Sequence, residues 1–131
     1  MKNLAVIGRV LFALPFGVMG LNHFLMQDYF LGMMTSFIPG GAYTILLTGV
    51  LLILACILII MNKFIKTVCY SLAGILLIFI ITIHIPGLST SNWQIALIEL
   101  LKDTALTGGA IMIALYSDAL KELSLKKDKR K

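Results

Sequence analysis

Three ionisable residues lie within five positions of an otherwise apolar stretch of the sequence. Glu99, Lys102 and Asp103 occur in "IELLKDTAL", and the apolar surroundings continue to Tyr116. Ionisable groups are costly in hydrocarbon, so they usually face a protein interior or a watery cavity, where they bind ligands or exchange protons. The i,i+3 spacing of Glu99 and Lys102 makes them neighbours on one helical face, with Asp103 beside them.

The composition shows that the surroundings of these charges are lipid. Of 131 residues, 60% are hydrophobic and 13% are charged, which is far from the soluble average. Apolar runs long enough to cross a hydrocarbon core of about 30 Å must be helical, because a helix pairs its own backbone groups. The sequence predicts an all-α, integral membrane bundle in a single domain, 1–131, with four spans: 4–24, 43–61, 67–85 and 95–116.

The first span is predicted to be a permanent membrane helix. It is longer than the apolar core of a secretory signal, and no small-x-small cleavage site follows it.

Lys and Arg residues indicate the orientation of the spans. The connections 25–42 and 86–94 contain neither residue type. Cations near span ends favour the cytoplasmic side, so both termini are predicted to be cytoplasmic. The tail 118–131 is then a solvated, orientation-setting segment, and nucleic-acid binding is not expected of it. On the cytoplasmic side the sequence places Lys2, Arg9, Lys63, Lys66 and six cations of the tail.

This topology brings polar side chains of three spans together in the outer half of the bundle. Counted from Ile95, the three charged residues of the fourth span lie about 6, 10 and 12 Å deep at 1.5 Å per residue. We expect a pocket for ligand binding or proton handling, since imidazoles and carboxylates exchange protons near neutral pH when burial and charge assist them. The candidate residues are Asn22, His23, His84, Glu99, Lys102 and Asp103.

A purely structural role is the alternative for the charged residues. Glu99, Lys102 and Asp103 would then neutralise one another and fix the register of the helices. Arg9 lies about 7 Å inside the cytoplasmic boundary, at the depth of Asp118. We expect a structural Arg9–Asp118 ion pair, or an Arg9 side chain that extends to lipid phosphates.

Metal and haem chemistry find little support in the sequence. No metal-ligand spacing occurs, so no metal is expected. His23 and His84 lie at similar depth, but their polar surroundings disfavour a haem between them. Cys56 and Cys69 do not form a Cys-x-x-Cys pair and are expected to be buried packing residues.

The outer connection 25–42 is unusually apolar for a loop. It contains six large apolar residues between positions 30 and 38, and one acidic residue, Asp28. Such a segment lies at the membrane interface as a connector or folds over the mouth of the bundle as a lid.

Three motifs, in this order, resemble the DoxX family of small bacterial four-span membrane proteins: "GRVLFALPFGVMGLNHF", "HIPG" and "LLKDTALTGGAIM". The likeness extends over almost the whole chain. It implies a multi-pass protein of the bacterial inner membrane with a link to redox systems, because DoxD-type relatives are associated with thiosulfate and quinone oxidoreduction. The family's polar positions correspond to Arg9, Gly20, Asn22, His23, Lys102, Asp103 and Gly108.

Two function classes follow. The first is a quinone-linked redox accessory subunit, in which His23 or His84 exchanges protons while Lys102 and Asp103 orient the quinone oxygens. The second is a non-catalytic assembly subunit or lipid-binding or small-molecule-binding protein within a larger complex or homo-oligomer; the small residues Ala105 and Gly109 would allow close helix approach. No complete catalytic motif is present, so enzymatic activity is left open. A transporter is disfavoured, because no inverted repeat is evident.

Overall fold

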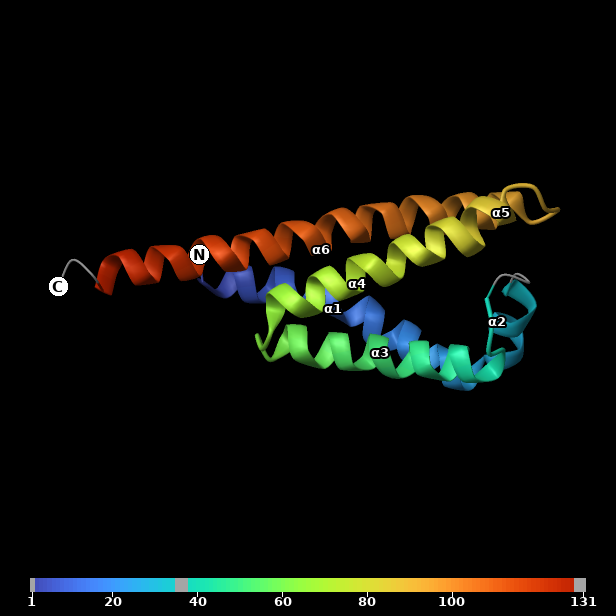
Figure 1. Cartoon of the computed structure of the whole chain (residues 1–131), viewed down its shortest axis with the longest axis horizontal. Helices are drawn as coiled ribbons and strands as arrows, with labels where there is room; N and C mark the ends of the chain where they lie inside the picture. Colours follow the sequence, from blue (N-terminus) through green and yellow to red (C-terminus); the bar gives the residue numbers. More distant parts are fainter. Residues whose placement is uncertain (1, 35–37, 129–131) are drawn as a thin grey trace.

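The computed structural model describes residues 2–34 and 38–128, with side-chain surroundings for 4–34 and 38–117, and every element in these ranges is helical (Figure 1). The elements are α1 (Lys2–Leu25), α2 (Gln27–Met33), α3 (Ala42–Ile60), α4 (Ile65–Phe79), the π-helical turn η1 (Ile80–His84), α5 (Ile85–Gly87) and α6 (Trp93–Asp128). The predicted all-α class is therefore confirmed.

Three of the helical segments are long and apolar enough to cross a membrane: Leu4–Leu25, Ala42–Ile60 and Ile65–Gly87. Their outer surfaces carry large apolar side chains, and Leu11 and Ile78 are 63% and 57% exposed. Lipid chains solvate such surfaces whereas water does not, so the helices indicate a multi-pass protein in a bilayer. The fourth predicted span lies in α6, which continues past Tyr116 to Asp128 and so includes most of the predicted tail.

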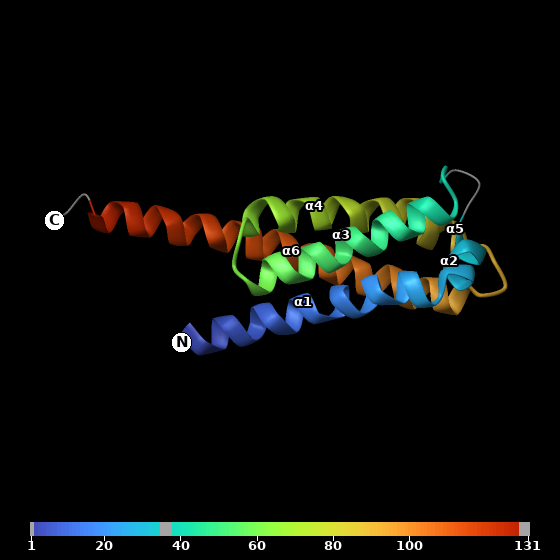
Figure 2. The same ribbon diagram turned by 90° about the horizontal axis from the view of Figure 1, so that it is seen from below.

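The long helices form two packed pairs. α1 packs chiefly on α3, and α4 packs chiefly on α6. A short connection around Asn62 and Phe64, both with positive φ, joins α3 to α4. Both termini lie at the end of the bundle where this connection lies, whereas α2 and α5 lie at the opposite end (Figures 1 and 2).

The half of the bundle near the termini is filled by a core between the two pairs. Small residues of α6 let it approach the larger side chains of the other helices. Cys56 and Cys69 are both buried in this core, as predicted. Its most buried members are Ala13, Leu52, Ile59, Cys69, Leu72, Ala110 and Ala114.

A glycine pair brings the backbones of α1 and α3 into contact. A Cβ atom on Gly20 would lie 2.8 Å from the Gly49 carbonyl oxygen, and a Cβ atom on Gly49 would lie 2.9 Å from the Gly20 carbonyl oxygen. The added Cβ of Gly49 would also lie 2.9 Å from the Cβ of His23. Close crossings of this kind are available only to very small residues, so this contact fixes where α1 places His23.

Ala105 and Gly109 of α6 are a second pair of small residues, and only Gly109 packs inside the bundle. A Cβ on Gly109 would lie 3.0 Å from the ring of Phe12, so Gly109 makes room for α1. Ala105 is exposed.

The glycine contact predicts different responses to the same substitution at two positions. Gly49→Ala forces backbone separation and should lower the free energy of unfolding by about 1–3 kcal/mol, as overpacking does. Gly74→Ala is the matched control, because a Cβ there meets nothing within 4 Å. Detergent-induced unfolding in mixed micelles measures both, and equal stability of the two variants would contradict the close crossing.

Candidate functional site

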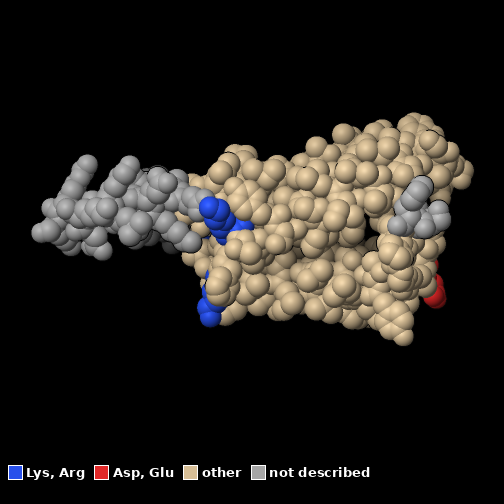
Figure 3. All heavy atoms as spheres, in the orientation of Figure 1, with Lys and Arg blue, Asp and Glu red and all other residues tan. Residues whose placement is uncertain are grey.

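A cavity of about 320 Å³, here called the inner cavity, lies between the two helix pairs. Figure 3 shows a hollow between α3 and α4 at the end of the bundle where α2 lies. Most of the wall is apolar, and polar groups are few, which is typical of ligand sites. The apolar part of the wall includes Phe16, Met19, Leu52, Leu76, Phe79 and Ile83.

All six candidate residues from the sequence line the inner cavity: Asn22, His23, His84, Glu99, Lys102 and Asp103. The structure therefore brings them together from α1, η1 and α6. Their part in ligand binding or proton exchange stays a prediction.

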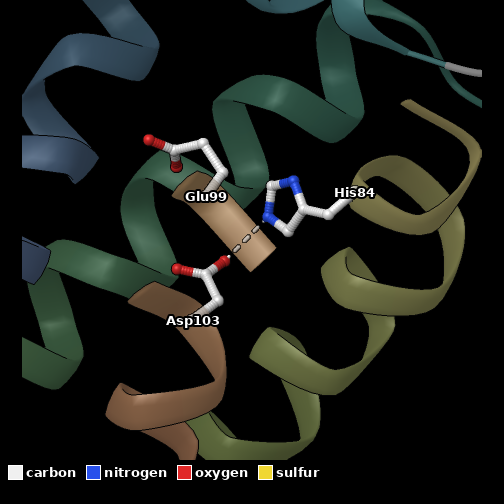
Figure 4. Close-up of side chains that lie close together, drawn as sticks. All are labelled: His84, Glu99 and Asp103. Atoms are coloured by element: carbon white, nitrogen blue, oxygen red, sulfur yellow. Dashed lines mark hydrogen bonds and ion pairs between the residues drawn. The ribbon is translucent and has the colours of Figure 1, made fainter. Parts of the chain in front are cut away.

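The closest polar contact joins His84 to Asp103. His84 Nε2 lies 2.9 Å from Asp103 Oδ2 (Figure 4), and the two residues are only 6% and 5% exposed. A carboxylate accepts hydrogen bonds, so Nε2 carries the proton. The other ring nitrogen, Nδ1, is buried and has no hydrogen-bond partner in the described part of the chain. Figure 4 shows the Nδ1 edge turned away from Asp103.

A π-helical turn places His84 at this position. Pro86 has no N–H, so it cannot donate to the carbonyl of Thr82 as an α-helix would require. The missing bond favours a widened turn, and η1 ends at His84, two residues before the proline. π-turns of this kind are frequent at functional sites.

Lys102 links the carboxylate of Glu99 to that of Asp103. Its ammonium forms an ion pair with Glu99 and lies 3.7 Å from Asp103 Oδ1. The side chains of Lys102 and Glu99 are 37% and 29% exposed, against 7% for Asp103. The three α6 groups and His84 thus form one network, which is electrically neutral when His84 is protonated.

His23 belongs to a different part of the cavity wall. Its Nδ1 donates to the Met19 carbonyl oxygen at 2.7 Å, so Nδ1 carries the proton in the neutral ring. The ring stacks on Phe30 of α2, with centroids 4.1 Å apart and planes 15° apart. His23 therefore holds α2 against the bundle.

α2 and α3 supply lining residues that the sequence analysis did not select. Tyr29, Phe30 and Met33 of α2 line the cavity, so the outer connection contributes to the wall through residues that the structure describes. Thr44 and Thr48 of α3 also line it. Their i,i+4 spacing in the apolar run "TILLT" was the available signal, because both hydroxyls lie on one helical face.

Arg9 lies on α1 and does not line the cavity. Its Nε is buried without a hydrogen-bond partner among the residues described. The side chain of Asp118 is outside the described residues, so the Arg9–Asp118 pair stays a prediction.

Three side chains that the sequence spacing did not group together lie close enough to share a metal ion. His84, Glu99 and Asp103 offer ligand atoms within 4.8 Å of one another. However, the Lys102 ammonium contacts both carboxylates and supplies positive charge there. A divalent cation would have to displace it, so the geometry favours internal ion pairing.

Comparison of the chain with family models, curated proteins and solved structures gives no match. The resemblance to the DoxX family rests on the sequence motifs alone.

Asp103 is buried and Glu99 is partly exposed, which predicts unequal contributions of the two carboxylates to the free energy of unfolding. Asp103→Ala leaves a buried imidazole N–H without its acceptor and should cost about 1–3 kcal/mol of unfolding free energy. Glu99→Ala removes a partly exposed ion pair and should cost less than about 1 kcal/mol. Unfolding in mixed micelles tests both, and an equal or larger loss for Glu99→Ala would be inconsistent with the geometry.

Proposed function

We propose that the chain is a four-span protein of the bacterial inner membrane that binds an isoprenoid quinone in its inner cavity, as an accessory subunit of a redox complex. The resemblance to the DoxX family supports the membrane and the redox association. Lys and Arg side chains gather at the end with the termini in the visible face of Figure 3, and an acidic side chain lies at the other end. This distribution supports cytoplasmic termini.

The observation that carries the proposal is the free edge of a buried imidazole whose other edge is paired. When His84 is neutral, its Nε2–H is held by Asp103, and the unpartnered Nδ1 is left able to accept a hydrogen bond from a ligand. When His84 is protonated, Nδ1–H becomes a donor. The same edge can therefore bind the hydroxyl of a quinol or the carbonyl of a quinone.

The rest of the cavity suits the body of such a ligand. A quinone head group is a flat ring with oxygens at its edge, and the cavity is apolar with its charged groups concentrated on His84 and α6. A volume of about 320 Å³ lies at the lower end of the range for small-molecule sites, which fits a ring better than a long tail. Lys102 and Asp103 supply charged groups that can orient the ring oxygens.

A route from the bilayer is provided by the hollow between α3 and α4. The helices beside it expose apolar side chains; Leu47 of α3 and Ile81 of η1 are 60% and 63% exposed. A ligand dissolved in lipid would enter sideways, and its isoprenoid tail would stay among the lipid chains. In this role His84 exchanges protons with the quinone, and a partner protein exchanges the electrons.

A non-catalytic assembly role is the second candidate. The partly exposed Lys102–Glu99 ion pair favours it, because charges facing lipid are costly and a partner protein would cover them.

Quinone binding should depend on the His84–Asp103 pair. His84→Phe and Asp103→Asn should each raise the dissociation constant of a short-chain quinone by about tenfold or more, equivalent to about 1.4 kcal/mol. Thr104→Ala is the matched control, because Thr104 is exposed on α6 and does not line the cavity. Equilibrium dialysis or calorimetry with detergent-purified protein measures the constants.

Equal affinity in the wild type and all three variants would overturn quinone binding at this site. Identification of proteins that co-purify in mild detergent would then test the assembly role.

A further inference from the structure

A second cavity, of about 390 Å³, lies at the end of the bundle opposite the termini and is lined by residues of α2, α5 and the start of α6. We call it the end cavity. Its wall includes Thr90 and Asn92, which are both exposed. It shares Tyr29, Met33, Met34, Ile83 and His84 with the wall of the inner cavity. His84 therefore lies between the two cavities.

The ionisable groups near His84 differ in which cavity they reach. Asp103, Glu99 and Lys102 come from α6, and His23 comes from α1; all four line the inner cavity only. Tyr29 of α2 lines both cavities. Among these groups, His84 is the imidazole that lines both cavities, and an imidazole has one ring nitrogen that can donate a proton and one that can accept it.

The second ring nitrogen of His84, Nδ1, is available for proton exchange. Nε2 is committed to Asp103, and Nδ1 is buried without a partner among the described residues. A buried nitrogen of this kind is usually satisfied by water or a ligand. Tyr29, Thr90 and Asn92 give the wall of the end cavity a polar part, and water in a cavity needs two to four polar partners. The Thr90 hydroxyl already donates to the Gly87 carbonyl oxygen.

We propose that the end cavity is a water-filled port through which His84 exchanges protons with the aqueous phase at the α2–α5 end of the bundle. A hydronium in the port gives its proton to Nδ1 and leaves water, and the reverse step releases the proton. The Asp103 carboxylate lies 2.9 Å from Nε2, on the other side of the ring. This inference deepens the proposed function: given the proposed topology, protons of the inner cavity would exchange with the non-cytoplasmic side.

Thiol labelling tests whether the port holds water. Ala96 lines the end cavity and is 9% exposed. Ala96→Cys in oriented proteoliposomes should react with a charged, impermeant methanethiosulfonate reagent added at the α2–α5 side. Cys56 and Cys69 line neither cavity and should stay unlabelled, which makes the wild type the control. Reaction from the opposite side only, or with an apolar permeant reagent only, would overturn the port.

Gly32→Cys provides a second test in case Ala96→Cys does not fold. Gly32 also lines the end cavity, and a Cβ there meets nothing within 4 Å. It should be labelled from the same side as Ala96→Cys. Labelling from the opposite side would contradict the proposal even if Ala96→Cys failed to fold.

Blocking the port tests its connection to His84. Diethyl pyrocarbonate modifies accessible imidazoles, and peptide mass spectrometry separates His84 from His23. Prior labelling of Ala96→Cys should abolish most modification of His84, while His23, which lines the inner cavity only, keeps its own level. Unchanged modification of His84 would refute the port. Neither experiment uses a quinone, so the port and quinone binding can fail separately.

Discussion

The hydrogen bond between His84 and Asp103 is the interaction on which the inner cavity depends. It joins the end of η1 to α6 across 2.9 Å, at a depth where an unpaired carboxylate would be strongly destabilising. Asp103 must therefore face η1, and this requirement fixes the rotation of α6. Lys102 and Glu99 then fall at the partly exposed edge of the same face, where they complete the charge balance.

The half of the bundle near the termini contains the packed core, and the half near α2 contains the inner cavity. Near the termini, small residues of α6 and large residues of α3 and α4 fill the space between the helix pairs. Toward α2 the pairs leave a cavity, and the Gly20–Gly49 crossing keeps α1 close enough for His23 to reach its wall. The packed half sets the spacing of the helices, and this spacing positions the polar groups of the hollow half.

Much of this arrangement could be predicted from the sequence, because the bilayer imposes few solutions. Long apolar runs must be helices, and the depths of His23, His84 and Asp103 follow from counting residues. Which imidazole pairs with Asp103 could not be predicted, because it depends on helix rotation and on the π-turn before Pro86. The contribution of α2 to both cavities depends on tertiary packing against His23, which periodicity does not encode.

The protonation of the two histidines in a bilayer tests the central claim most directly. The chain has only two, so ¹⁵N-histidine labelling gives two resolvable rings in solid-state NMR spectra. At a pH where both are neutral, His84 should carry its proton on Nε2 and His23 on Nδ1, and an added quinone should shift the Nδ1 signal of His84. A proton on Nδ1 of His84, with a signal that quinone leaves unchanged, would contradict the account.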